Sequence, residues 1–160
     1  MNEIELEYAG FWVRTGAFVI DSILLGLIMA PLLLYIYGWQ YFFAKSPIAG
    51  PADFLITWIF PAVATVLFWI NKQATPGKMA FSARIVDAIS GEAASTGQMI
   101  GRYFAYLISF IPLGLGFFWI AIDRRKQGWH DKLAGTVVVR KKPAPVKFVK
   151  ATGQEQYEVG

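Results

Sequence analysis

Residues Phe11–Tyr37 read FWVRTGAFVIDSILLGLIMAPLLLYIY and decide the fold class, because only Arg14 and Asp21 among these 27 residues carry a charge. As an α-helix, the stretch extends ~40 Å at 1.5 Å per residue, enough to cross a hydrocarbon core of ~30 Å with some tilt. We therefore predict a membrane-spanning helix here. A charged side chain at membrane depth costs a few kcal/mol or more, so it usually faces a protein interior or a watery cavity.

Arg14 and Asp21 lie seven residues apart, so on a helix they project from nearly the same face. Asp21 lies ~15 Å along the helix axis from Phe11, close to mid-bilayer, and its short side chain reaches neither interface. Two interpretations of Asp21 stay open: an ion- or proton-coupling carboxylate, or a hydrogen-bonded packing residue. Arg14 either extends to lipid headgroups or forms a buried ion pair.

The composition is typical of a membrane protein. Hydrophobic residues make up 56% of the 160 residues and charged residues 16%, against roughly 25% charged in soluble domains. The first eight residues contain three glutamates and lack the basic region of a signal peptide, so we expect the first helix to be retained. The net charge of +4 comes mainly from the C-terminal third and favours contact with anionic lipid over nucleic acid.

A second span is predicted over Phe54–Ile70, which contains no charged residue. Pro61 lies near its middle and should bend it, because proline lacks the backbone N–H and clashes with the preceding turn. The connection, Gly38–Asp53, is rich in aromatic and turn-forming residues, which indicates an interfacial belt.

Two β-rich runs, Phe81–Asp87 and Thr136–Arg140, are expected to pair as a small extramembrane cap. Before them, Thr75–Lys78 reads as a turn that brings Lys78 to the membrane surface. It is no phosphate-binding loop, because Lys72 and Met79 occupy positions where that loop needs glycine and a hydroxyl residue.

The third apolar segment, Met99–Ile122, is interrupted by Pro112-Leu113-Gly114-Leu115-Gly116. It is either a third span or a re-entrant pair of half-helices, and the basic residues on both flanks favour the pair because positive charge collects on the cytoplasmic side. The N-terminus, the middle loop and the C-terminus are then cytoplasmic. From Lys141 onward the polar sequence predicts a mobile tail.

Four stretches together resemble the RDD family of small bacterial membrane proteins; they are Arg14–Asp21, Thr75–Asp87, Ile111–Asp123 and Arg125–Arg140. The resemblance assigns the family arginine to Arg14, the first aspartate to Asp21, and the second to Asp131, with Asp123 as the alternative. It implies a membrane domain over residues 10–142 between an N-terminal segment, 1–9, and a polar tail, 143–160. It also implies a multi-pass protein of the bacterial inner membrane, usually suspected of transport.

His130 and Asp131 follow a basic run and indicate the cytoplasmic boundary. The pair reads either as a local turn or cap, or as a docking point at which Asp131 binds Arg14 through a bidentate contact. A pH-sensing role of His130 is a further hypothesis. With one histidine and no cysteine, we expect no metal, no cofactor and no enzymatic activity.

The predicted fold is an all-α membrane protein with two spanning helices, a re-entrant or third helical element, and a small cytoplasmic β pairing. Its predicted function is transport, with Asp21 as the coupling carboxylate. The alternative is a non-catalytic membrane scaffold in which Arg14, Asp21 and Asp131 form structural pairs. Because so few membrane elements cannot easily enclose a pathway, we expect a homo-oligomer or a larger membrane partner in the lipid bilayer.

Overall fold

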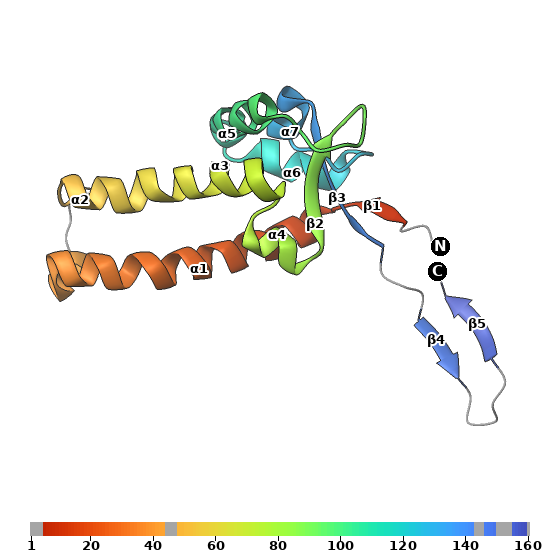
Figure 1. Ribbon diagram of the computed structural model, residues 1–160, viewed down its shortest axis with the longest axis horizontal. Helices are drawn as coiled ribbons and strands as arrows, with labels where there is room; N and C mark the ends of the chain where they lie inside the picture. The colour runs from red at the N-terminus through yellow and green to blue at the C-terminus, as the bar shows by residue number, and fades with distance from the viewer. Residues whose placement is uncertain (1–4, 44–47, 143–145, 150–154, 160) are drawn as a thin grey trace.

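The computed structural model describes residues 5–43, 48–142, 146–149 and 155–159. Two helical arms in it are long and apolar enough to cross a membrane. The first is α1 (Phe11–Tyr37), with the bounds predicted from the sequence. The second runs from Pro51 to Lys72 as α2 (Pro51–Phe54), the π-helical η2 (Leu55–Ile59) and α3 (Phe60–Lys72). Figure 1 shows the two arms running alongside each other, away from the rest of the protein.

The second arm exceeds its predicted bounds at both ends, and it continues through Pro61. The π-helical turn η2 ends just before Pro61, which occupies the first turn of α3. At that position the missing N–H removes no hydrogen bond of the α-helical pattern. Between the arms, a short 3₁₀-helix, η1 (Trp39–Phe43), carries aromatic residues, and residues 44–47 of the predicted belt lie outside the described structure.

A three-stranded antiparallel sheet covers the other end of the arms, with strand order β1-β3-β2. The predicted pairing is confirmed: β2 (Ala83–Asp87) pairs with β3 (Thr136–Lys141), and Ile85 lies opposite Val138. The third strand, β1 (Leu6–Tyr8), was not predicted, because three residues carry no readable alternation. Ile85 and Val138 are fully buried and pack with Trp69 and Met99 in the main hydrophobic core.

The predicted break in the third apolar segment is confirmed. Helix α5 (Thr96–Phe110) and helix α6 (Leu115–Ile122) meet at an angle of 101°. Gly114, with φ of +77°, supplies the left-handed turn that ends the break. Because β2 precedes this pair and β3 follows it, both ends of the pair return to one sheet.

Two local predictions are wrong. The segment Thr75–Lys78 is not a simple turn but begins a short helix, α4 (Pro76–Ala80). In the tail, β4 (Val146–Val149) and β5 (Glu155–Val159) form an antiparallel pair where a mobile tail was expected. The cap expected at His130 and Asp131 is confirmed, because both residues belong to a short helix, α7 (Trp129–Ala134), whose first turn the Asp131 side chain caps.

The sheet pairing makes a topological prediction for the α5–α6 unit. Cysteines placed at Ile89, between β2 and α5, and at Lys142, after β3, should react from the same side of the membrane, because both positions adjoin one sheet. Both are exposed, and the chain has no native cysteine. Labelling of intact and lysed cells with an impermeant thiol reagent measures this. Labelling of one site in intact cells and of the other only after lysis would show that α5 and α6 cross the membrane as a third span.

Candidate functional site: a buried network of charges

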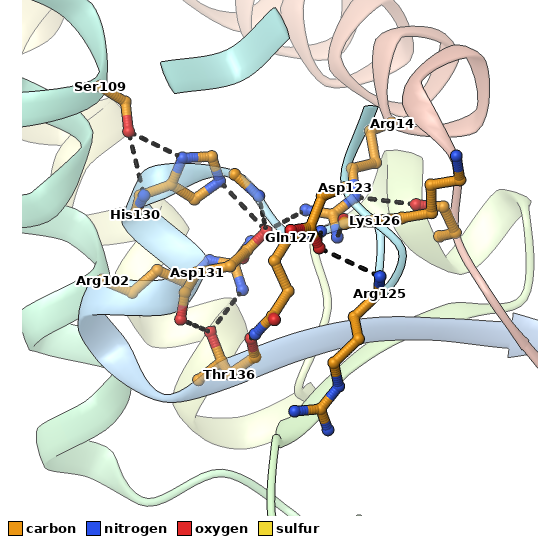
Figure 2. A network of polar contacts seen from close by, with 12 residues as sticks. Arg14, Arg102, Ser109, Asp123, Arg125, Lys126, Gln127, His130, Asp131 and Thr136 are labelled. Atoms are coloured by element: carbon orange, nitrogen blue, oxygen red, sulfur yellow. Dashed lines mark hydrogen bonds and ion pairs between the residues drawn. The ribbon is translucent and has the colours of Figure 1, made fainter. Parts of the chain in front are cut away.

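Asp131 lies at the centre of a buried polar network formed by α1, α5 and α7 (Figure 2). Its Oδ2 is 2.5 Å from Nη1 of Arg14, and its Oδ1 is 2.6 Å from Nη2 of Arg102. The carboxylate also accepts a hydrogen bond of 2.9 Å from the backbone N–H of Gly128, which caps α7. Its side chain is fully buried, so these contacts take the place of water around Oδ2, whereas Oδ1 has the ion pair with Arg102 but no hydrogen-bond partner among the described residues.

Arg14 binds three different oxygens instead of forking onto one carboxylate. Nη1 contacts Asp131, Nε donates to the carbonyl of Ala9 at 3.0 Å, and Nη2 donates to the carbonyl of Lys126 at 2.6 Å. The expected partner is therefore present, but the expected bidentate geometry is wrong. The side chain is only 9% exposed, so Arg14 does not extend to lipid headgroups. These hydrogen bonds connect the start of α1 to Ala9, the residue after β1, and to the loop before α7.

Arg102 is the member of the network that the sequence did not indicate. Near the front of an apolar segment, it reads as one more basic flanking residue. In the structure its side chain is 1% exposed and donates to Oγ1 of Thr136 at 3.0 Å as well as pairing with Asp131. Its Cζ lies 5.3 Å from the centre of the Trp69 ring, a cation–π distance. A lone arginine on the buried face of α5 is the signal that could have revealed it.

The two arginines hold the Asp131 carboxylate in its ionised form. Burial alone would raise the pKa of Asp131, but the charges of Arg102 and Arg14 outweigh it and leave the pKa well below the ordinary value. A buried carboxylate between two guanidinium groups is strongly coupled to both. Removal of the carboxylate would therefore leave two buried positive charges without a counter-charge.

His130 is neutral around neutral pH, since burial lowers its pKa to about 3. A hydrogen bond of 3.1 Å joins its Nδ1 to Oγ of Ser109, and its ring packs against Tyr106 and Phe117. Ser109 also accepts from the backbone N–H of His130 at 3.0 Å. His130 thus fixes α7 against α5, and a sensor that responds near pH 6.5 does not fit these surroundings.

His130 should make the protein less stable as the pH falls from about 6.5 toward about 3. Between these pH values His130 binds a proton in the unfolded chain but not in the native state, so acidification favours unfolding. Above pH 6.5 both states are neutral and the effect vanishes. Thermal unfolding against pH measures this, and His130→Asn, which keeps a polar group beside Ser109, should flatten the slope above about pH 4.5. An unchanged slope in His130→Asn would show that another group causes it.

Asp21 does not pair with Arg14, although both lie on one face of α1. Its Oδ2 accepts from Oγ1 of Thr75 at 2.5 Å, and its Oδ1 accepts from the backbone N–H of Gly77 at 2.7 Å. Asp21 therefore caps the first turn of α4, which packs directly on α1. The close approach requires Gly77, since a Cβ there would lie 2.0 Å from the carbonyl oxygen of Ala17.

Lys78 extends the Asp21 contact toward Arg102. Its Nζ donates to Oγ1 of Thr75 at 3.5 Å, the same hydroxyl that binds Asp21, and lies 5.7 Å from the centre of the Trp69 ring. Burial, followed by the charge of Arg102, lowers the pKa of Lys78 to about 8. Among the described residues no carboxylate lies within salt-bridge distance of Lys78. The sequence placed Lys78 at the membrane surface, and the structure shows it half-buried.

Asp123, the alternative second aspartate, lies apart from Arg14. Its Oδ1 is 2.5 Å from Nζ of Lys132, and its Oδ2 accepts from the backbone N–H groups of Arg125 and Gln127. It organises the loop between α6 and α7. The geometry thus brings Asp131, not Asp123, to Arg14.

A second polar cluster closes the far end of the two arms and was not predicted. Asp53, 3% exposed, accepts hydrogen bonds from the hydroxyls of Tyr41 at 2.6 Å and Thr57 at 2.8 Å. It also accepts from the backbone N–H of Ala49, while its own N–H donates to the hydroxyl of Tyr37. These contacts join the end of α1 to the start of the second arm, so the cluster positions the arms.

No group of three or more metal-binding side chains occurs within the part of the chain that the structure describes. The network instead consists of guanidinium, ammonium and carboxylate groups, which form ion pairs; the ammonium and carboxylate groups can also exchange protons, whereas the guanidinium groups stay charged. With two apolar arms and a cap fastened by buried charges, the protein belongs to the class of small helical membrane proteins.

The chain belongs to the RDD family, whose model matches residues 8–135. The uncharacterized protein YxaI of Bacillus subtilis is 33% identical over 150 residues, which cover 83% of this chain and 97% of that relative. The uncharacterized protein RP437 of Rickettsia prowazekii is 37% identical over 75 residues, covering 47% and 41% of the two chains. The uncharacterized membrane protein YteJ of Bacillus subtilis is 27% identical over 154 residues, covering 84% and 82%. No solved structure matches this chain.

Proposed function

We propose that this RDD-family membrane protein is a component of an ion- or proton-coupled transporter in the bacterial inner membrane. The observation that supports the proposal is a chain of contacts from Asp21 through Thr75 to Lys78. It links a carboxylate within a spanning helix to a half-buried amine that has no carboxylate of the described residues within salt-bridge distance. An ionisable group with a pKa of about 8 gains and loses a proton near physiological pH, which coupling requires.

This proposal moves the coupling role from Asp21 alone to Asp21 and Lys78 together. Asp21 is engaged with α4, so its charge acts through the hydroxyl of Thr75. Arg14, Arg102 and Asp131 hold the cap in place around this pair. The proposal assigns no catalytic step to the protein, and it places both termini in the cytoplasm, on the side where basic residues collect.

Self-association forms part of the same proposal, whereas a larger partner belongs to its alternative. Most apolar side chains of α1 and of the second arm are exposed, and only Ala17 and Leu33 are buried in α1. In a single copy the two arms therefore have few protein contacts, and further helices are needed to line a pathway.

The same observation favours a second candidate function, a membrane scaffold in which the charges serve only to hold the sheet and α7 against α1. Affinity purification from native membranes distinguishes the two, because a stoichiometric larger partner supports the scaffold.

Removal of the Lys78 amine should abolish coupled flux. In proteoliposomes carrying a pH gradient, exchange of protons for sodium or potassium should fall roughly tenfold or more in Lys78→Gln, because the group that carries the proton is gone. Lys132→Gln is the matched control, since Lys132 also lies over a tryptophan but is paired with Asp123. Size-exclusion chromatography confirms that both variants fold. Native rates in Lys78→Gln, or no flux from the native protein with either cation, would contradict the transport proposal.

A further inference from the structure

Two buried hydrogen-bond donors without an acceptor lie at and beside the Trp69 ring. The indole Nε1 of Trp69 and Nε of Arg102 are both buried without a hydrogen-bond partner, and each of the two residues is 1% exposed. Oδ1 of Asp131 is buried without a hydrogen-bond partner as well, and it lies 2.6 Å from Nη2 of Arg102 in an ion pair, not at these two donors. Nζ of Lys78, near the same ring, has only the hydroxyl of Thr75 at 3.5 Å. Buried donors are nearly always paired in native proteins, so unpaired ones in one place indicate a missing acceptor.

The charges in this region do not balance. Arg14, Arg102 and Lys78 supply three positive charges, whereas Asp21 and Asp131 supply two negative charges, and His130 is neutral. Arg102 and Lys78 both lie within 6 Å of the centre of one indole ring. Cation–π attraction offsets part of their repulsion, about 0.5–2 kcal/mol, but it leaves the net charge unchanged. An acceptor that also carries a negative charge would satisfy the donors and balance the charge.

We propose that a small inorganic anion of about the size of chloride binds beside Trp69, between Lys78 and Arg102. Trp69 Nε1, Arg102 Nε and Lys78 Nζ are its donors. Two of the three donors are fully buried, so the site admits a compact ion rather than a large organic anion. A water molecule would satisfy donors but carries no charge, so it would leave the excess positive charge in place.

The inference does not depend on transport, because binding is measured at equilibrium in detergent. It does depend on the protonated form of Lys78, whose charged neighbours are Arg102 on α5, Asp21 and Arg14 on α1, and Asp131 on α7. Since an anion favours the charged amine, chloride should bind more weakly as the pH rises above about 8.

The line width of the ³⁵Cl NMR signal tests the site with the full chain in a non-ionic detergent. Native protein should broaden the signal saturably and reversibly, and bromide should compete, whereas gluconate at equal ionic strength should not. Lys78→Gln should weaken chloride binding tenfold or more, and Lys78→Arg should restore most of it. Lys132→Gln should bind as the native protein does, because Lys132 has Asp123 as its counter-charge.

Two results would overturn the inference, and a lipid control separates the sources of anion. No saturable broadening by the native protein, or equal broadening by folded Lys78→Gln, would show that the unpaired donors bind water. Phosphatidylglycerol added to the micelles should leave the chloride signal unchanged. Displacement of chloride by that lipid would instead assign the site to a headgroup phosphate and would contradict a compact inorganic ion.

Discussion

Asp131→Asn should remove most of the stability of this protein. The change keeps the size of the side chain but leaves Arg14 and Arg102, 9% and 1% exposed, without a counter-charge. Breaking a buried ion pair on one side typically costs ~3–5 kcal/mol, and here two arginines lose their partner. Because whole domains have only ~5–15 kcal/mol of stability, most of the protein should fail to fold. Fluorescence-detected size exclusion and thermal unfolding in detergent measure the loss.

Asp123→Asn is the control for this prediction. Its partner Lys132 is 43% exposed at the side chain, and such pairs contribute about 0–1 kcal/mol. The added change Arg14→Gln should recover only part of the stability of Asp131→Asn, since Arg102 stays unpaired. If Asp131→Asn proves as stable as Asp123→Asn, the buried network is not what holds α5 and α7 against α1.

Gly77→Ala should detach α4 from α1. The new Cβ would lie 2.0 Å from the carbonyl oxygen of Ala17 and 2.9 Å from Cγ of Asp21, so the backbones must separate. That separation also breaks the hydrogen bond from the N–H of Gly77 to Asp21. Overpacking typically lowers the free energy of unfolding by ~1–3 kcal/mol. The loss here should lie at the upper end of that range, because the new Cβ is attached to one backbone and collides with another, and neither can move as a side chain can. Thermal unfolding should show a large drop in midpoint, with loss of flux where the protein still inserts.

Gly101→Ala is the matched glycine change, because a Cβ at Gly101 meets nothing within 4 Å and the residue lies inside α5. Alanine is favoured over glycine in a helix by up to ~1 kcal/mol, so this variant should be as stable as the native protein or more so. Equal stability of Gly77→Ala and Gly101→Ala would show that the close contact between α4 and α1 is not required.

The spanning helices and the β2–β3 pair could be predicted from the sequence because both depend on local patterns. The length of the apolar run set the bounds of α1, and the Pro/Gly cluster set the break between α5 and α6. The short helices α4 and α7 could not be predicted this way. Helices of five and six residues are unstable alone, and they form here because Asp21 caps one and Asp131 caps the other from within its own first turn.

The sequence identified most of the charged residues of the candidate site but not which residue each of them binds. Arg14 and Asp21 share a helix face, which favoured a relation between them, yet each binds a partner more than 50 residues away. Those pairings depend on how α4 and α7 dock, which periodicity does not encode. Arg102 was missed for the same reason: its burial follows from the packing of α5 on α7, and its sequence neighbourhood resembles an ordinary basic flank.

The pH dependence of proton-coupled cation exchange by the native protein in proteoliposomes decides whether the Asp21–Thr75–Lys78 contacts carry function. A group that never releases its proton, or never takes one up, cannot complete a transport cycle. The rate should therefore be greatest near pH 8, where Lys78 titrates, and fall on either side. A rate that is constant between about pH 6 and pH 9, or that is greatest where free carboxylates titrate, near about pH 4, would contradict a coupling role for Lys78.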